Sequence, residues 1–175
     1  MLFLQTFDAV SRYSETQLAK EGISKTRYTV LVMLDNAQAP PTLTELSRWM
    51  FRSKNSTTTV IDHMERDGLV QRVRDARDGR SVRVAATEAG RELFDQVRQP
   101  SRELVYRIMA CFEEEDKLDR FAELLRMLRE NVLQELAGDS GLKPVALRGS
   151  EHIREGWCYN LIKTKKGKGG GAYTK

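Results

Sequence analysis

The sequence predicts a mainly α-helical protein that carries one small β-hairpin. Residues 1–66 contain four segments in which apolar residues recur at intervals of three or four, the period of an amphipathic helix. Residues 69–73 and 81–86 instead alternate apolar and polar side chains, as half-buried strands do, and Asp78-Gly79 between them is a strong hairpin-turn signal. Helical periodicity returns after the hairpin. We therefore expect helices, then a hairpin, then helices again.

The composition is that of a globular protein without a membrane span. The chain has 175 residues, which suits one domain with its own core, and 40% of them are hydrophobic while 31% are charged. No apolar run approaches the about 20 residues that a transmembrane helix needs. The start of the chain lacks the basic segment and the small-residue cleavage site of a signal peptide. We therefore expect a cytoplasmic protein.

The charge is distributed unevenly along the chain. The formal net charge is +4, but residues 139–175 alone hold eight Lys/Arg and three Asp/Glu. Residues 45–83 hold nine basic and six acidic side chains, whereas residues 113–135 hold four basic and eight acidic ones. A basic middle and an acidic later segment predict a polarised molecule.

The first two helices are expected before residue 40. Leu4, Phe7 and Val10 recur at helical spacing from the beginning of the chain. Ser24 suits the N-cap of the second helix, whose side chain would accept a hydrogen bond from the first turn. Pro40 and the proline after it close this helix.

A third and a fourth helix follow at once. Thr42 and Glu45 have the spacing of a capping box at the start of the third helix, and Gly68 ends the fourth. One face of the fourth helix is apolar, and the other carries short polar side chains: Asn55, Ser56, Thr58, Thr59 and Asp62. Ser and Thr are mediocre helix formers, so exposure alone does not favour them there. Short hydroxyl and amide groups suit close approach to the base edges of DNA.

Short helices followed directly by a two-stranded hairpin are the layout of a winged helix-turn-helix. Residues 73–84, around the hairpin tip, contain arginine but neither lysine nor an aromatic residue. A narrow minor groove concentrates negative potential and admits a slim, weakly hydrated guanidinium better than an ammonium. The alternative is a solvated Arg/Asp turn with weak surface ion pairs.

Two further helices are expected after the hairpin. Thr87 suits the N-cap of a long fifth helix reaching Phe112, in which Pro100 should produce a kink. The acidic residues 113–116 favour the N-terminus of a sixth helix. Its apolar residues follow a heptad pattern, which Leu124 and Leu136 broaden: Leu118, Phe121, Leu125, Leu128 and Val132. This apolar surface exceeds what one subunit covers, and it predicts a homodimer through the first, fifth and sixth helices.

Residues 55–93, NSTTTVIDHMERDGLVQRVRDARDGRSVRVAATEAGREL, resemble the MarR (multiple antibiotic resistance regulator) family. The shared features are the Ser/Thr-rich fourth helix, the following MERDGLV, Asp-x-Arg in the hairpin, and TEAG at the next helix. The resemblance implies a dimeric DNA-binding transcriptional regulator, most simply a repressor, that reads a pseudo-palindromic operator. It also implies a winged helix-turn-helix over residues 23–87 and a helical dimerisation region over 1–22 and 88–137. Residues 138–175 lie outside it and read as a basic, disordered tail.

The resemblance assigns the fourth helix to the major groove and the hairpin, as a wing, to the adjacent minor groove. The implied DNA contacts are Ser53, Lys54, Asn55, Ser56, Thr58, Thr59, Arg77, Asp78 and Arg80. Asp78 would hold the arginine fork while Arg77 or Arg80 inserts. Relatives often bind small aromatic acids in a cleft between the dimerisation region and the DNA-binding lobe. The aromatic residues that suit such a cleft here are Phe7, Tyr13, Tyr28 and Trp49.

We expect neither a cofactor, nor a metal site, nor catalysis. His63 is the single histidine before residue 138, and zinc sites need three or four nitrogen or sulfur ligands. Cys111 ends an apolar stripe, so we expect a buried, inert thiol rather than a peroxide sensor. No nucleophile is paired with a base, so an enzyme is not expected. The rival interpretation is a dimeric winged-helix module that binds protein, whose contacts would respond little to salt, unlike contacts to DNA phosphates.

Overall fold

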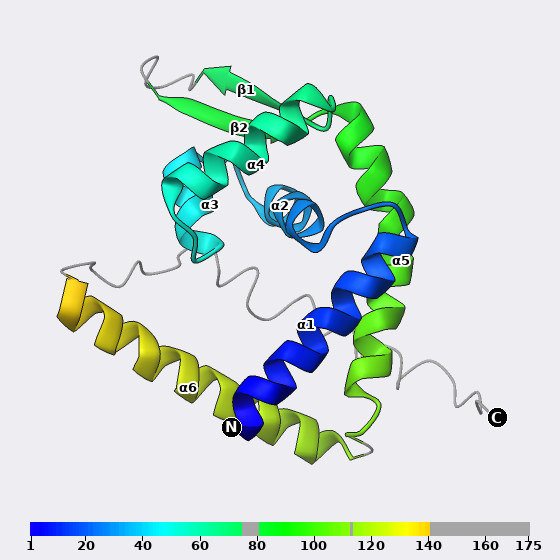
Figure 1. Ribbon diagram of the computed structural model, residues 1–175, viewed down its shortest axis with the longest axis vertical. Helices are drawn as coiled ribbons and strands as arrows, with labels where there is room; N and C mark the ends of the chain where they lie inside the picture. The colour runs from blue at the N-terminus through cyan, green and yellow to red at the C-terminus, as the bar shows by residue number, and fades with distance from the viewer. Residues whose placement is uncertain (75–80, 113, 141–175) are drawn as a thin grey trace.

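The computed structural model describes residues 1–74, 81–112 and 114–140, which form helices and one two-stranded sheet (Figure 1). The predicted fold class, mainly helical with a small β-hairpin, is confirmed. In chain order the elements are α1 (Leu2–Lys20), α2 (Lys25–Asn36), α3 (Leu43–Trp49), α4 (Lys54–Arg66), β1 (Val70–Arg74), β2 (Val82–Ala86), α5 (Glu88–Met109) and α6 (Glu115–Ser140).

The predicted helix caps are formed. Ser24 caps α2, Thr42 caps α3, and Thr87 caps α5 by accepting a hydrogen bond from the backbone N–H of the third helical residue. The capping box of α3 is complete, because the backbone N–H of Thr42 donates to Glu45 Oε2 at 2.7 Å. These caps satisfy backbone donors that a helix leaves unpaired in its first turn, and they fix where each helix begins.

The hairpin has the expected antiparallel pairing. Val70 lies opposite Ala86 and Arg74 lies opposite Val82. The backbone N–H of Val84 donates to the carbonyl of Pro41 at 2.8 Å, which attaches β2 to the segment before α3. The predicted turn at Asp78-Gly79 lies outside the described residues.

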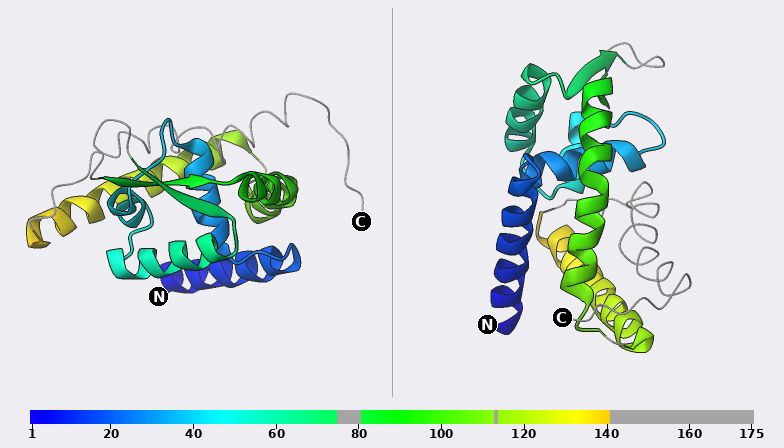
Figure 2. Two further views of the ribbon diagram at one scale, coloured as in Figure 1. Left: turned by 90° about the horizontal axis from the view of Figure 1, so that it is seen from above. Right: turned by 90° about the vertical axis from the view of Figure 1, so that its right-hand side faces the viewer.

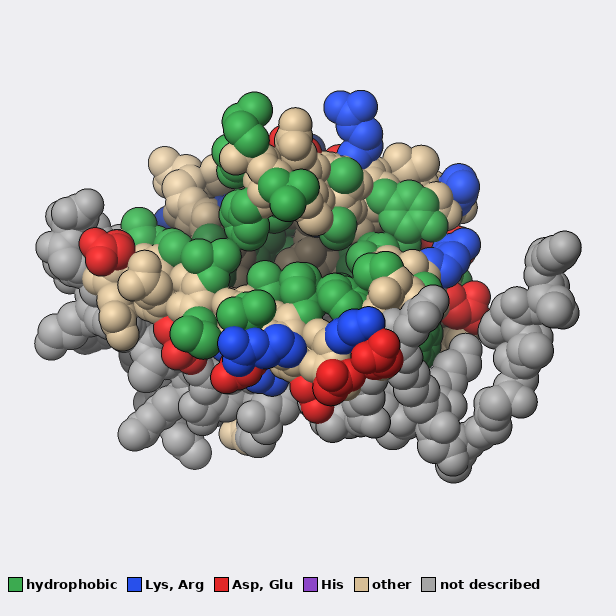
Figure 3. All heavy atoms as spheres, turned by 90° about the horizontal axis from the view of Figure 1, so that it is seen from below, with side chains coloured by type: hydrophobic (Ala, Val, Ile, Leu, Met, Phe, Trp, Pro, Cys, Tyr) green, Lys and Arg blue, Asp and Glu red, His purple; other side chains and the backbone are tan. Residues whose placement is uncertain are grey.

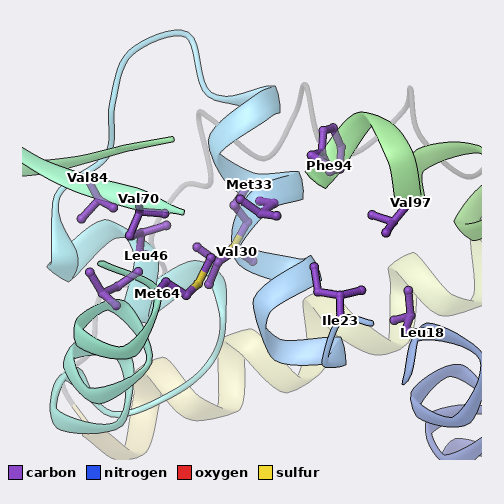
Figure 4. Packing of buried hydrophobic residues seen from close by; sticks show 12 residues of the cluster. Leu18, Ile23, Val30, Met33, Leu46, Met64, Val70, Val84, Phe94 and Val97 are labelled. Carbon is purple, nitrogen blue, oxygen red and sulfur yellow. The ribbon is translucent and has the colours of Figure 1, made fainter. Parts of the chain in front are cut away.

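The core lies where the hairpin meets α2, α3, α4 and α5. Figure 4 shows side chains from these elements converging between the hairpin and the helices. The predicted inner face of α4 is confirmed, because Thr57, Ile61 and Met64 are fully buried and Val60 is half-buried. From α2, α3 and the hairpin come Val30, Leu31, Leu46, Val70 and Val84.

One glycine permits the close approach of α5 to the hairpin. A Cβ atom on Gly90 would lie 2.0 Å from the carbonyl oxygen of Leu69. That same carbonyl accepts a hydrogen bond from the backbone N–H of Thr87 at 3.1 Å. Only a residue without a side chain fits in the first turn of α5 at this spacing.

The two ends of the molecule are built from different elements. The hairpin lies at one end, beside α4, whereas the start of α1 and the helix α6 lie at the other (Figures 1 and 2). Helix α5 runs between the two ends, and α1 contacts both α2 and α5. The structure thus separates the predicted DNA-reading elements from the predicted dimerisation elements.

Three helix details differ from the expectations or extend them. Helix α5 ends at Met109, before the predicted Phe112, so Cys111 lies in the following turn and is exposed; the prediction of a buried thiol is wrong. Helix periodicity does not apply beyond the end of the helix, and this is why the pattern misplaced that residue. Helix α6 continues to Ser140, and α5 runs through Pro100 without interruption. No described helix is long and apolar enough to cross a membrane.

Candidate nucleic-acid interface

Helix α4 presents a polar face to solvent from a firmly packed base. Asn55, Ser56 and Thr59 are exposed and Thr58 is half-buried, while the opposite face lies in the core. Ser53, a predicted DNA contact, is also the N-cap of α4, since its hydroxyl accepts a hydrogen bond from the Ser56 backbone N–H at 3.2 Å. This cap was not predicted from the sequence. The start of the helix is therefore held rigidly while its side chains face outward.

The hydroxyl groups on this face have a defined hydrogen-bonding state. Thr58 Oγ1 donates to the carbonyl of Lys54 at 2.9 Å, and Thr59 Oγ1 donates to the carbonyl of Asn55 at 3.1 Å. Each hydroxyl has one hydrogen, so both donors are used inside the helix. What remains for another molecule is an acceptor oxygen and a methyl group, which suit an exocyclic amino group of a base or the thymine methyl.

Asn55 differs from these threonines. Within the described part of the chain its exposed amide makes no side-chain hydrogen bond. Its donor and its acceptor are therefore both available, and an amide in this position suits the N6 and N7 atoms of adenine. Lys54 is likewise exposed at the first helical position, where its ammonium and the helix N-terminus together favour a phosphate.

An arginine of the hairpin joins β1 to α4. Arg72 binds Asp62 at 2.5 Å and also pairs with Glu65, whose other oxygen accepts the Arg72 backbone N–H at 2.9 Å. The Asp62 hydrogen bond and the Glu65 interactions raise the pKa of Arg72, although its partial burial opposes this. The guanidinium thus stays charged, and it fixes the hairpin relative to α4.

This link was not predicted from the sequence, although the strand pattern contains a signal for it. Strand alternation places Arg72 on the same side as the buried Val70. A charged residue at an inward position needs a partner, and the sequence offers acidic residues on both sides of Arg72, among them Asp62 and Glu65 of the preceding helix. Which of them it binds depends on the three-dimensional packing.

A second arginine attaches the hairpin to α3. Arg83 Nη1 donates to the carbonyl of Pro40 at 2.8 Å and lies 3.9 Å from Glu45 Oε2. Its side chain is 29% exposed, so these contacts hold it against the protein surface. Arg77, Asp78 and Arg80, the predicted wing contacts, lie outside the described residues, so their roles stay predictions.

The four residues of the predicted effector cleft come from three helices. Phe7 and Tyr13 lie on α1 and are exposed, Tyr28 on α2 packs 6.1 Å from the ring of Phe94, and Trp49 on α3 packs against the core. Beside Phe7, the Lys25 ammonium lies 5.9 Å from the ring centroid. The structure does not show all four around one cavity.

The opposite end of the molecule carries an exposed apolar surface. Figure 3 shows hydrophobic side chains gathered around a hollow at this end. The large hydrophobic side chains that α1 and α6 expose include Leu2, Phe3, Leu4, Phe7, Val10, Leu124, Leu125, Met127, Leu128, Val132 and Leu136. We call them the α1/α6 apolar face.

No candidate metal-binding cluster is found in residues 1–74, 81–112 and 114–140. There, no group of three or more His, Cys, Asp or Glu side chains is placed to hold a metal ion.

Residues 23–82 match the MarR family model. The HTH-type transcriptional regulator YkoM of Bacillus subtilis is 30% identical over 96 residues, which cover 55% of this chain and 62% of YkoM. The match therefore spans less than two thirds of that relative.

Solved structures show the same fold. AbsC, a MarR family transcriptional regulator from Streptomyces coelicolor, superposes with a TM-score of 0.70 at 22% identity, covering 75% of this chain and 89% of AbsC. MepR from S. aureus, solved as a complex with DNA, gives a TM-score of 0.65 at 21% identity, covering 74% of this chain and 95% of MepR. The similarity thus extends from the winged helix-turn-helix to helices outside it.

Proposed function

We propose that this chain is a MarR family member and a dimeric transcriptional regulator that binds a pseudo-palindromic DNA operator, a proposal supported by the match of residues 23–82 to the family model. The observation that carries the proposal is the outer face of α4. A row of short polar side chains on a rigid, capped helix is held beside a hairpin by the Arg72 link to Asp62 and Glu65. In this proposal α4 enters the major groove and the hairpin reaches the adjacent minor groove.

The contacts divide by chemistry. Asn55, Thr58 and Thr59 read base edges, while Ser53, Lys54 and Ser56 at the helix start position the protein on phosphates. At the wing, Arg77 or Arg80 enters the minor groove and Asp78 holds the guanidinium. Asp78→Ala then lowers operator affinity although it raises the positive charge, because the arginine is no longer anchored.

The proposed dimer uses residues 1–22 and 88–137, with residues 23–87 as the DNA-binding unit. The α1/α6 apolar face supports this division, since large exposed apolar patches mark association surfaces. The twofold axis would present two α4 helices to half-sites about one helical turn apart. A protein bound across a promoter in this way blocks transcription, so we propose a repressor.

The experiment is a DNA shift assay with the promoter region beside the protein's own gene. Affinity should fall steeply as salt rises, because binding releases counterions from phosphates. Asn55→Ala should cost about 1–3 kcal/mol and change base preference within each half-site. Gln96→Ala, an exposed residue of α5 away from this face, is the matched control and should leave affinity unchanged.

The rival function, a protein-binding winged helix, predicts a different result. Such a protein would show no preference for the promoter over an unrelated fragment of equal length, and Asn55→Ala would behave as Gln96→Ala does. That outcome would refute the proposed operator binding.

We further propose that a small aromatic acid releases the DNA. The Lys25 ammonium, 5.9 Å from the Phe7 ring and 2.5 Å from Ser11 Oγ, supplies a positive charge beside the aromatic residues of α1. Benzoate should weaken operator binding of the unaltered protein but not of Lys25→Gln. Equal weakening of both would exclude Lys25 from the effector site.

A further inference from the structure

We propose that the cavity between α2, β2 and α5 binds a small amphipathic amine, with one apolar ring and one positively charged nitrogen. The cavity is formed by segments far apart in the sequence, and none of Phe7, Tyr13, Tyr28 or Trp49 lines it. It is therefore distinct from the effector cleft proposed above and from the outer face of α4. The inference does not depend on DNA binding.

The cavity has a buried apolar floor. Its volume is about 330 Å³, and it lies between the second half of α2, the loop before α3, β2 and the first turns of α5. Leu31, Val84 and Phe94 in its wall are at most 3% exposed, so they are held by the core behind them. This size is at the lower end for small-molecule sites, which run from about 300 to 1,000 Å³. A ligand with a single ring fits it.

The polar rim has an excess of negative charge. Asp35 and Asp95 line the cavity, and both lie near one cation, since Arg98 is 3.4 Å from Asp35 Oδ2 and 3.6 Å from Asp95 Oδ1. The third charged residue of the rim, Arg91, pairs with Glu88 at 2.9 Å. These five groups carry three negative and two positive charges. A bound cation therefore compensates the rim, whereas a bound anion adds to the repulsion.

The Phe94 ring in the cavity wall already has one cation beside it. The Arg98 guanidinium lies 5.4 Å from the centroid of the Phe94 ring, within the range of a cation–π contact. Phe94 itself lines the cavity. A ligand ammonium at the rim would be near the carboxylates of Asp35 and Asp95, while the ring of the ligand packs against Leu31, Val84 and Phe94.

Two shape-matched probes test the charge preference with the full-length protein. Phenethylamine and 3-phenylpropionate share a ring and a two-carbon chain but carry opposite charges. We expect phenethylamine to bind at least tenfold more tightly, measured by ligand-observed NMR or calorimetry in the absence of DNA. Equal affinities, or tighter binding of the carboxylate, would overturn the proposal.

Two variants locate the site. Ala85→Leu places a larger side chain in the cavity and leaves less room for a ligand, and Asp95→Asn removes one negative charge from the rim. Each substitution should weaken phenethylamine binding at least fivefold. Glu92→Gln removes an exposed carboxylate on the same helix that does not line the cavity, and it should leave binding unchanged.

Circular dichroism establishes that each variant is folded. Asp95 is exposed on the surface of α5, so Asp95→Asn keeps the test decisive if Ala85→Leu disturbs the sheet. Binding that survives Asp95→Asn unchanged, or that falls equally in Glu92→Gln, places the amine elsewhere and refutes the site. Because no DNA is present, either result leaves the proposed operator binding untouched.

Discussion

At the scale of single residues, the threonines of α4 present a restricted chemistry. Because Thr58 and Thr59 donate to carbonyls of their own helix, they offer acceptors and methyl groups, while Asn55 alone on this face offers an amide with both functions. In the proposed operator complex, we expect such a helix to distinguish bases by acceptors and by apolar contact as much as by donated hydrogen bonds.

Two substitutions at Thr59 separate these contributions. Thr59→Val keeps the shape and the methyl group but removes the acceptor, whereas Thr59→Ser keeps the hydroxyl and removes the methyl. If the methyl packs on a thymine, Thr59→Ser should lose about 1 kcal/mol of operator affinity while Thr59→Val retains it. Competition with operators in which each thymine is replaced by uracil measures this, because uracil lacks that methyl. If the unaltered protein binds the uracil-containing operators as tightly as the original operator, the methyl contact is excluded.

Arg72 provides the second prediction at this scale. Arg72→Met removes the link from β1 to Asp62 and Glu65 while keeping an unbranched apolar stem. We expect the free energy of unfolding in urea to fall by about 1 kcal/mol, since both acidic partners keep some contact with water. The loss in the free energy of operator binding should exceed this loss in the free energy of unfolding, because the hairpin is no longer fixed relative to α4.

The control for Arg72 is Arg91→Met. Arg91 makes an exposed ion pair with Glu88 within one helix, and its loss should change neither stability nor DNA binding by more than about 0.5 kcal/mol. If Arg72→Met loses stability without any loss of operator affinity, the arginine only stabilises the fold and does not position the hairpin.

At the scale of elements, local signals predicted most of the fold. The caps at Ser24, Thr42 and Thr87 and the pairing of the hairpin depend on neighbours within a few residues, and the structure confirms them. The end of α5 was misjudged, and Cys111 with it, because an apolar stripe continues in the sequence after the helix has ended.

The candidate site likewise has one part that local sequence patterns predict and another part that they do not. The polar face of α4 follows from helical periodicity alone, so its residues could be named in advance. The partners of Arg72 and the cavity beside Phe94 are formed by segments that meet only in the folded chain. No periodic pattern contains that information.

Gly90 shows how an element boundary depends on packing. Replacing glycine by alanine inside a helix ordinarily stabilises it by about 1 kcal/mol. Gly90→Ala should instead destabilise the protein by about 1–3 kcal/mol, because the new Cβ would lie 2.0 Å from the Leu69 carbonyl and the two elements must separate. Urea unfolding measures the difference, and Ala89→Gly, at the exposed neighbouring position, should show the ordinary cost of glycine. A stabilised Gly90→Ala protein would contradict this packing.

At the scale of the whole molecule, the α1/α6 apolar face predicts the assembly. Leu128 is 44% exposed near the middle of α6, in the heptad pattern. Leu128→Glu places a charge in that surface, so we expect sedimentation at micromolar concentration to show a folded monomer where the unaltered protein is a dimer. Gln134→Glu adds the same charge at an exposed polar position of α6 and should leave the dimer intact. A monomeric unaltered protein would refute the proposed dimer.

The position of the winged helix-turn-helix between α1 and α5 has a consequence during synthesis. Helix α1 leaves the ribosome before the elements it contacts, and residues 23–87 follow it before α5 is made. At about 5–20 residues per second, its apolar side chains stay uncovered for several seconds. The hairpin and α2 to α4 complete most of the core within that interval. Ribosome-bound chains arrested once residue 87 has emerged should therefore protect residues 23–87 from protease, while the first turns of α1 remain open to cleavage and to chaperones.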